Sequence, residues 1–380
     1  MGKKYNMLCD KTAKDIKNKC LDCRLCMKGC PMLNEYCTSP LNLFKDISED
    51  KPLKAEIPFS CTQCGYCFNV CPSKIPLDKI FLSLRSALCE DNKGIPPVKG
   101  YSTIKYHQKN SFSKIFTASS NSLNKKFNNV FLPGCSLSSY NPNLIIKTYN
   151  YLKKVYNNDI GILLKCCGNP THSMGQKELF NKYYSLLIKD IEIMGAKNII
   201  TACPSCYNTI LENSKDLKVI SIWEVIAKNG IKDFKRAEDI ENFALHDPCP
   251  TRGYPQIHKA IRDILLNLGY EYEEFSYSKD KTLCCGNGGM IGVTNKDLFK
   301  KQVFKRASMA SSEVILSYCA TCVNSFALPY KKSIHILDLI FYDGKGKLKY
   351  NLKPLSPLKG WKNRFICKNL ILNSIKGKED

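Results

Sequence analysis

Residues 20–31 read CLDCRLCMKGCP, and residues 61–72 read CTQCGYCFNVCP. Both stretches place three cysteines at every third position, followed by a fourth cysteine and a proline. This spacing is typical of 4Fe–4S ligands, because three close thiolates can wrap one corner of a cubane while the fourth cysteine ligates a neighbouring cluster. Structural zinc is the alternative for paired C-x2-C motifs, but a triple motif with a following Cys-Pro, present twice, is a poor zinc pattern.

The two motifs predict two cubane 4Fe–4S clusters that exchange their fourth ligands. We assign the first cluster to Cys20, Cys23, Cys26 and Cys71. We assign the second cluster to Cys61, Cys64, Cys67 and Cys30. The segment between the two motifs has helical character, so we expect a mainly helical two-cluster domain over residues 1–100 rather than a β-rich one.

A different cysteine pattern occurs twice beyond residue 130. Its first copy consists of Cys135, Cys166, Cys167, Cys203 and Cys206, and its second of Cys249, Cys284, Cys285, Cys319 and Cys322. Cys249 lies 114 residues after Cys135, and Cys319 lies 116 residues after Cys203. So steady an offset indicates an internal duplication.

Each copy of this pattern reads as an α/β unit. Short apolar runs that predict strands precede most of its cysteines: residues 130–133, 160–164, 198–202, 243–245 and 314–318. Between them we expect helices from Pro142 to about Tyr156 and from Pro255 to about Leu268, with Gly269 ending the second. Alternating strands and helices favour mostly parallel sheets, whose sites lie at the carboxyl ends of the strands. The cysteines fall there.

Length and composition fit this division. The chain has 380 residues, of which 44% are hydrophobic and 22 are cysteines, so several packed domains are expected. We expect an α+β multidomain protein with the following parts: a ferredoxin-type domain at 1–100, a linker at 101–127, two α/β domains at 128–238 and 239–343, and a basic amphipathic tail at 344–380. No apolar run resembles a signal peptide or spans a bilayer, so we expect a cytoplasmic protein whose paired cysteines are metal or redox ligands.

The formal charge of +23 raises nucleic-acid binding as a rival function. Eighteen ligand thiolates would reduce that charge to +5 before the positive cluster cores restore part of it. The lysines are spread along the whole chain, and recognition motifs with interleaved aromatic residues are absent. We therefore expect no nucleic-acid partner.

The tail combines basic and apolar side chains: Trp361, Phe365, Ile366, Leu370, Ile371 and Ile375 stand among lysines and an arginine. Three interpretations stay open: an interfacial helix on anionic lipid, a docking helix for another subunit, and a helix packed on its own domain. The first would place the protein peripherally on the inner face of the membrane.

The pattern GC…CCG…CPSC, followed by HDPC…CCGNGGM…CATC, resembles the duplicated cysteine-rich (CCG) domain of heterodisulfide reductase catalytic subunits. Iron–sulfur subunits of anaerobic glycerol-3-phosphate dehydrogenase and glycolate oxidase carry the same domain. The resemblance covers about residues 15–343, and it implies that each complete CCG motif holds a noncubane 4Fe–4S cluster at which a disulfide can be cleaved. Both copies keep all five cysteines, so we expect four clusters and eighteen ligands in total.

Two functions are compatible with these ligands. The first is an electron-transfer subunit of an anaerobic oxidoreductase, which relays electrons between a flavoprotein or ferredoxin and a quinone or other acceptor. No flavin or nicotinamide motif is found, so a flavoprotein dehydrogenase or other redox subunit would be a separate partner. The alternative is a reductase that cleaves a disulfide at the cluster of Cys249, Cys284, Cys285, Cys319 and Cys322.

Other polar positions receive simpler interpretations. Residues 286–292 imitate a nucleotide fingerprint, but Cys284 and Cys285 explain their glycines as a tight cluster loop. His246 and Asp247 are read as loop support rather than a proton relay, and His172 has the same two readings. We expect the following to be ordinary positions: His107, His258 and His335, the leftover thiols Cys9, Cys37, Cys89 and Cys367, and the core residue Trp223.

Overall fold

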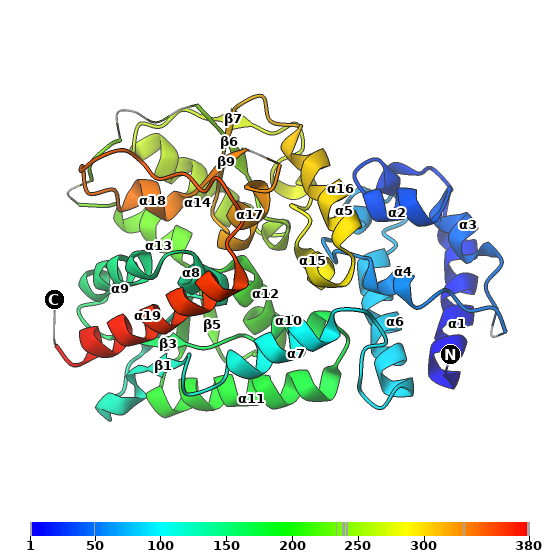
Figure 1. Ribbon diagram of the computed structural model, residues 1–380, viewed down its shortest axis with the longest axis horizontal. Helices are drawn as coiled ribbons and strands as arrows, with labels where there is room; N and C mark the ends of the chain where they lie inside the picture. The colour runs from blue at the N-terminus through cyan, green and yellow to red at the C-terminus, as the bar shows by residue number, and fades with distance from the viewer. Residues whose placement is uncertain are drawn as a thin grey trace.

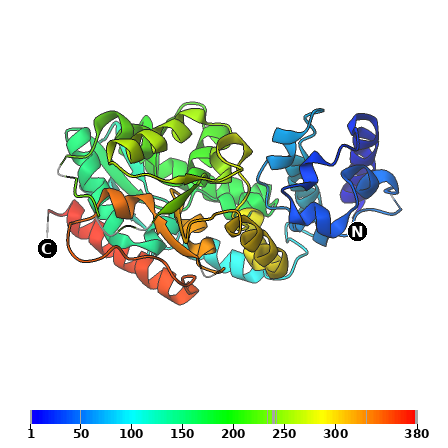
Figure 2. The ribbon, with the colours of Figure 1, turned by 90° about the horizontal axis from the view of Figure 1, so that it is seen from above.

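A computed structural model describes residues 2–48, 50–232, 234–237, 240, 242–329 and 331–377. The N-terminal helices form a lobe at one end of the molecule, and two sheets with their helices form the other, larger part (Figures 1 and 2). The C-terminal helix lies on the larger part, far from the N-terminus.

The N-terminal lobe is helical, as predicted. Its helices are α1 (Lys3–Lys19), α2 (Pro31–Tyr36), α3 (Pro40–Lys45), α4 (Glu56–Phe59), α5 (Tyr66–Val70) and α6 (Leu77–Asp91). No strand occurs among the described residues before Ala118. Prolines stand at the first position of α2 and α3, where a missing N–H costs nothing, and the side chains of Cys30 and Ser39 cap these helices. Buried Tyr5, Phe44 and Phe81 contribute to the core of this lobe.

The first sheet follows the N-terminal lobe in the chain. Its strands are β1 (Ala118–Ser119), β2 (Asn129–Leu132), β3 (Ile160–Leu164), β4 (Asn198–Thr201) and β5 (Lys218–Ser221), in the order β1-β3-β2-β4-β5. All pairings are parallel except that of β1 with β3. The accompanying helices are α8 (Cys135–Tyr140), α9 (Pro142–Val155), α10 (Asn169–Ser173), α11 (Lys177–Met194), α12 (Pro204–Asn213) and α13 (Ile222–Asn229).

The second sheet repeats this arrangement. Its strands are β6 (Phe243–His246), β7 (Glu273–Glu274), β8 (Val314–Ser317) and β9 (Lys332–His335), and they run parallel in the order β7-β6-β8-β9. This order matches β3-β2-β4-β5 of the first sheet. The helices are α14 (Pro255–Asn267), α15 (Ile291–Thr294), α16 (Lys296–Ala307), α17 (Ala320–Phe326) and α18 (Ile336–Ile340). The predicted strands before the cysteines and the predicted helices at 142–156 and 255–268 are thus confirmed.

The two α/β units share one hydrophobic core. Buried Ile145 and Trp223 of the first unit belong to the same apolar cluster as Ile261 and Leu337 of the second. Helices α13 and α14 pack against each other within it. Trp223 is buried, as the sequence predicted. The predicted boundary between the units, at residues 238 and 239, lies outside the described residues.

Residues 101–127 were predicted to be a linker, but the structure shows that they are part of the packed fold. They contain α7 (Tyr101–Asn110) and strand β1, which adds an antiparallel edge to the first sheet. Ile104 and Ala118 are buried, and the hydroxyl of buried Ser120 accepts a hydrogen bond from the backbone of Ile162. A few apolar side chains and one hydroxyl therefore anchor a segment whose Ser, Asn and Lys content indicated a solvated connection.

The tail contains one long helix, α19 (Pro357–Ile375), which packs on α8 and α9. Arg364, Cys367 and Ile371 are buried, and the ring of Trp361 lies 4.6 Å from that of Phe116. This arrangement corresponds to the third interpretation, a helix packed on its own domain. No helix of the described residues is long and apolar enough to cross a membrane.

Arg85 on α6 joins the N-terminal lobe to both α/β units. The guanidinium is fully buried, and it donates to four backbone carbonyls: those of Pro58 (2.8 Å), Cys61 (2.6 Å), Ser173 (2.6 Å) and Gly289 (2.9 Å). The first two carbonyls belong to the lobe, and the other two follow the first and second CCG motifs. One side chain therefore satisfies buried acceptors from three parts of the chain.

We expect Arg85→Met to lower the free energy of unfolding by about 3–5 kcal/mol, because it leaves several buried carbonyls without a donor. Anaerobic urea denaturation of the holoprotein measures this loss. Arg236→Met is the control, since exposed Arg236 stacks on Tyr270 and its loss should cost about 1 kcal/mol or less. Equal losses in the two variants would contradict the role of Arg85 as the joint.

Candidate metal centres

The first predicted cubane site lies in a cavity of the N-terminal lobe. Its wall includes all four assigned cysteines, Cys20, Cys23, Cys26 and Cys71, together with apolar side chains. Helix α1 ends at Cys20, and the loop then winds through two residues of positive φ, Asp22 and Arg24. The structure thus gathers a cysteine of the second motif beside three of the first.

The second predicted cubane site lies in a neighbouring cavity, which is lined by Cys30, Cys61, Cys64 and Cys67. Its loop repeats the conformation of the first, because Gln63 and Gly65 have positive φ at the positions that match Asp22 and Arg24. The backbone N–H of Gln63 points at the sulfur of Cys61, 3.3 Å away. The same φ pattern in both motifs curls each loop around its cavity.

The donor chemistry of these cavities fits iron–sulfur clusters. Each cavity is lined by its four assigned cysteines and by one further cysteine, Cys67 in the first and Cys284 in the second, and backbone N–H groups donate to the sulfurs of Cys30 and Cys61. Burial raises the pKa of Cys26 to about 12 and that of Cys61 to about 12. These thiols would remain protonated at neutral pH without a metal, so cluster binding must displace their protons.

The first CCG site lies at the carboxyl edge of the first sheet. Its cysteines follow three strands: Cys135 comes after β2, Cys166 and Cys167 after β3, and Cys203 and Cys206 after β4. Hydrogen bonds from Cys166 and Cys206 lower the pKa of Cys167 to about 5, which links three of the five sulfurs. A Cβ on Gly134 (φ +87°) would stand 2.6 Å from the Cβ of Cys203, so only glycine lets these two loops meet.

The second CCG site has the same construction. Cys249 follows β6, Cys319 directly precedes α17, and Cys322 lies in the first turn of that helix. The sulfurs of Cys249 and Cys284 are 3.9 Å apart, and a hydrogen bond from Cys322 leads the causes that lower the pKa of Cys319 to about 7. The structure therefore brings each predicted set of five cysteines together at one sheet edge.

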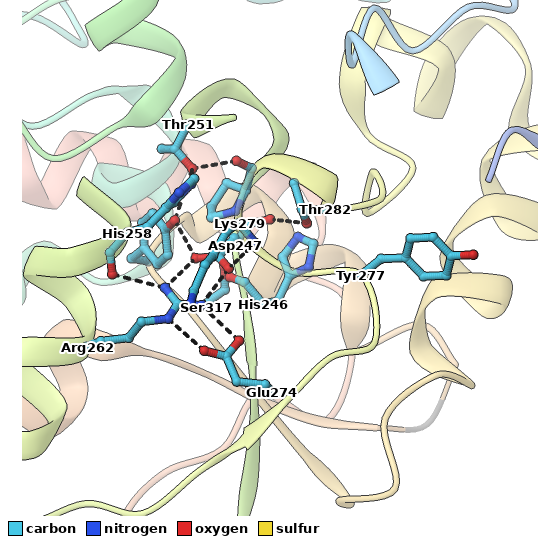
Figure 3. Close-up of polar contacts among 12 residues, drawn as sticks. His246, Asp247, Thr251, His258, Arg262, Glu274, Tyr277, Lys279, Thr282 and Ser317 are labelled. Atoms are coloured by element: carbon cyan, nitrogen blue, oxygen red, sulfur yellow. Dashed lines mark hydrogen bonds and ion pairs between the residues drawn. The ribbon is translucent and has the colours of Figure 1, made fainter. Parts of the chain in front are cut away.

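Asp247 supports the loop of the second CCG site (Figure 3). Its buried carboxylate accepts hydrogen bonds from Arg262 (2.8 and 3.1 Å), from the Tyr318 hydroxyl (2.8 Å) and from the Lys279 backbone (2.8 Å). Burial opposes ionisation, yet the Arg262 guanidinium and these donors lower the pKa of Asp247. With four donors on an ionised carboxylate, Asp247 is a structural anchor rather than a proton carrier.

His246 differs from its neighbour. Its ring is fully buried, and Nδ1 accepts a hydrogen bond from Nε of Arg306 at 3.3 Å. Its Nε2 has no hydrogen-bond partner among the described residues, and the ring lies with Cys285 and Cys322 in a group whose ligand atoms are all within 4.8 Å of one another. Burial, followed by the charge of Arg306, lowers the pKa of His246 to about 3.

The other histidines are buried or half-buried. The ring of His172 lies 4.9 Å from that of Phe180 in a tilted arrangement, and burial lowers the pKa of His172. His258 contacts the hydroxyl of Thr251 beside the Asp247 network, which its sequence position did not indicate. His335 is buried and caps α18, and His107 lies against Trp361.

The four leftover cysteines lie away from these sites. Cys9, Cys89 and Cys367 are buried, and the half-buried Cys37 donates to the carbonyl of Leu33. They behave as small packing residues.

The second cubane cavity and the second CCG site adjoin each other. Cys284 lines the same cavity as the four cubane cysteines, and its charge raises the pKa of Cys64 after the larger effect of burial. Arg252, three residues after Cys249, donates to the carbonyl of Cys64 at 3.1 Å and to that of Thr282 at 2.5 Å. Neither Arg252 nor Arg85 was predicted from the sequence, since nothing near them in the chain identifies their distant partners.

The glycines of residues 286–292 allow this loop of the second CCG site to lie against the second cubane motif. A Cβ on Gly288 would lie 2.2 Å from the carbonyl oxygen of Thr62, and one on Gly289 would lie 2.2 Å from that of Cys61. The loop therefore needs glycine in order to touch the second cubane motif. This contact accounts for a sequence that imitates a nucleotide fingerprint.

Comparison with known proteins agrees with this architecture. Residues 16–75 match the 4Fe-4S dicluster domain family, and residues 129–211 and 243–327 each match the cysteine-rich CCG family. The chain is therefore an iron–sulfur protein with several clusters, built from one dicluster domain and two CCG domains.

Its relatives include components of redox complexes. The chain is 24% identical to a subunit of the CoM/CoB fumarate reductase of Methanothermobacter marburgensis, over 87% of this chain and 69% of the relative. It is 25% identical to a subunit of the dihydromethanophenazine:CoB–CoM heterodisulfide reductase of Methanosarcina barkeri, over 69% of this chain and 70% of the relative. A shorter match, 24% identical over 43% of this chain and 25% of the relative, is to an EtfAB:quinone oxidoreductase of Syntrophomonas wolfei.

Gly288→Ala should disturb the junction between the second cubane and second CCG sites, because its methyl group must displace the Thr62 backbone. We expect a lower iron content and a lower denaturation midpoint than in the wild type. Gly253→Ala is the matched control, since a Cβ there meets nothing within 4 Å among the described residues. If Gly288→Ala keeps full iron and stability, the close approach is not required.

Proposed function

We propose that this chain is the electron-transfer subunit of an oxidoreductase, with two cubane and two CCG-bound 4Fe–4S clusters. The observation that carries the proposal is the shared cavity, in which Cys284 of the second CCG site faces the ligands of the second cubane site. Adjacent clusters let electrons pass from one centre to the next without crossing solvent. The direction we propose runs from the first cubane through the second to the CCG centres.

The ligand assignments follow the cavities and sheet edges. Cys20, Cys23, Cys26 and Cys71 hold the first cubane, and Cys30, Cys61, Cys64 and Cys67 hold the second. The first CCG cluster takes Cys135, Cys166, Cys167, Cys203 and Cys206, and the second takes Cys249, Cys284, Cys285, Cys319 and Cys322. The clusters supply one-electron redox chemistry when bound. The chain's own contribution is to bury the thiols, direct backbone N–H groups at sulfur and keep the centres adjacent.

The electron donor in this proposal is a separate redox subunit, such as a flavoprotein, and a quinone is one acceptor that fits. Support comes from the relatives, whose names describe subunits of multi-subunit reductases and a quinone oxidoreductase. Anaerobic co-purification that recovers a flavoprotein bound to this chain, and reduction of the clusters by that partner, would test the proposal. A reduced chain that passes no electrons to any quinone would contradict the choice of acceptor.

Disulfide cleavage at a CCG centre is the second candidate. Cys249 is half-buried while Cys284, Cys285, Cys319 and Cys322 are buried, so Cys249 is the cysteine of this site nearest to solvent. The similarity to a heterodisulfide reductase subunit points the same way. Cleavage consumes two electrons and two protons and converts one disulfide into two thiols. Oxidation of the reduced, isolated chain by a disulfide would favour this candidate over simple relay.

Iron and sulfide analysis of anaerobically purified protein should give about 16 irons per chain if all four sites hold 4Fe–4S clusters. Cys64→Ser should remove one cubane and Cys285→Ser one CCG cluster, each a loss of about four irons, because each removes a ligand of one site. Electron paramagnetic resonance (EPR) during a redox titration identifies which signal disappears.

Cys37→Ser is the control for both variants, since Cys37 is a leftover thiol whose hydrogen bond to Leu33 a serine can keep. It should retain the full iron content. Fewer than half of the expected irons in the wild type would overturn the ligand assignment. Loss of every cluster in both ligand variants would show that the sites do not load independently.

A further inference from the structure

The ring of His246 is held in one orientation beside the second CCG site. It lies 4.8 Å from the ring of Phe326 and 6.1 Å from that of Phe275, both nearly perpendicular to it. One edge of the imidazole receives the Arg306 N–H on Nδ1. The other nitrogen, Nε2, is buried and meets no hydrogen-bond partner in the described part of the chain, although an unpaired buried polar atom is costly.

Arg306 determines which nitrogen carries the proton. A guanidinium has no acceptor, so Nδ1 must offer it a lone pair, and the proton of the neutral imidazole then resides on Nε2. Arg306 is itself fixed, because it lies 3.9 Å above the ring of Phe275 and donates to the carbonyl of Tyr277 at 2.7 Å. Nε2 is therefore an N–H donor that needs an acceptor, and a negatively charged sulfur near it would supply one.

The same argument separates a donor from a metal ligand. His246, Cys285 and Cys322 are close enough together to resemble a mixed nitrogen and sulfur metal site. A ligating Nε2 would need its lone pair free and the proton on Nδ1, where that proton would face the Arg306 N–H. The tautomer that Arg306 imposes therefore makes Nε2 a hydrogen-bond donor rather than a metal ligand.

The first CCG site differs at the matching position. His246 stands three residues before the first cysteine of its site, at the end of β6, and pairs with Ser317 in the sheet. Leu132 occupies the equivalent place at the end of β2 and pairs with Thr201. The duplicated backbone thus presents an N–H donor in one repeat and a hydrocarbon side chain in the other.

We propose that His246 donates its Nε2–H to the sulfurs of Cys285 and Cys322, and thereby gives the second CCG cluster a higher reduction potential than the first. Hydrogen bonds to cluster sulfur stabilise the more negative, reduced state. The inference rests on the proposed function, since it needs a cluster in this site. It makes the second CCG centre the preferred acceptor of electrons from the adjoining second cubane.

Two substitutions test the roles of the Nδ1 and Nε2 edges of the His246 ring separately. In His246→Asn, the amide oxygen replaces Nδ1 as the acceptor for Arg306, but no group reaches the cysteines. His246→Gln extends an amide N–H toward the position of Nε2. We expect the potential of the second CCG centre to fall in His246→Asn and to stay nearer the wild-type value in His246→Gln, while the first centre is unchanged in both.

An EPR-monitored redox titration measures these potentials, and the signal that is absent in Cys285→Ser identifies the second centre. An unchanged potential in a fully iron-loaded His246→Asn would overturn the inference. A wild-type protein without iron in this site would overturn the proposed function, and iron analysis of the wild type distinguishes that failure from the first.

A measurement on the wild type avoids any folding defect of the variants. Pulsed EPR of protein labelled with [15N]histidine should show a weak nitrogen coupling at the second CCG centre, with a proton coupling that disappears in D2O. A strong coupling would identify a nitrogen ligand and overturn the inference. Absence of any histidine coupling would overturn it as well.

Discussion

The architecture depends on one buried cation. The guanidinium of Arg85 is satisfied by four backbone carbonyls from the lobe and from both CCG loops, rather than by a carboxylate among the described residues. Burial lowers the pKa of Arg85 to about 10, while the nearby thiol of Cys61, when ionised, favours the charged form. A buried charge is costly unless something compensates it. If Cys61 binds a cluster as proposed, its thiolate is a negative charge close to Arg85, and the cation that joins the domains and the anionic centre beside it would stabilise each other.

The internal duplication explains why both α/β units can contact Arg85. Both sheets have the same strand order, and both deliver their cysteines at the carboxyl edge, where loops from three strands meet. In each unit, the segment after the CCG motif supplies a carbonyl to Arg85, from Ser173 at the end of α10 in the first and from Gly289 in the second. Two copies of one fold therefore contact the same helix of the N-terminal lobe through the segments that follow their CCG motifs.

The sequence pattern predicted those strands and helices whose formation depends on residues close together in the chain. Strands β2, β3, β4, β6 and β8 are mostly buried apolar runs, each followed within three residues by a cysteine, and Pro142 and Pro255 begin helices because proline suits the first helical turn. The cysteine spacing alone predicted which cysteines lie together in the fold. Residues 101–127 and the tail were harder, because their burial comes from single side chains such as Ile104 and Ile371 that meet distant elements. Arg85 and Arg252 could not be found, since the carbonyls that they bind carry no side-chain signal.

The two repeats share a backbone but not an electrostatic environment. The second CCG site shares a cavity with the second cubane motif and contacts it through Arg252, Gly288 and Gly289. The first CCG unit instead contacts the N-terminal lobe through the backbone carbonyl of Ser173, which accepts hydrogen bonds from Gln63 and Arg85. Around the second site, Arg262 balances Asp247 and Arg306 fixes His246, and both arginines lie on helices of the second unit. Because a potential responds to nearby charge and to hydrogen bonds on sulfur, equal ligand sets in these unequal surroundings need not be equal electron acceptors. A duplication that kept all ten cysteines while it changed the residues around them can therefore divide the roles of the two centres without changing the fold.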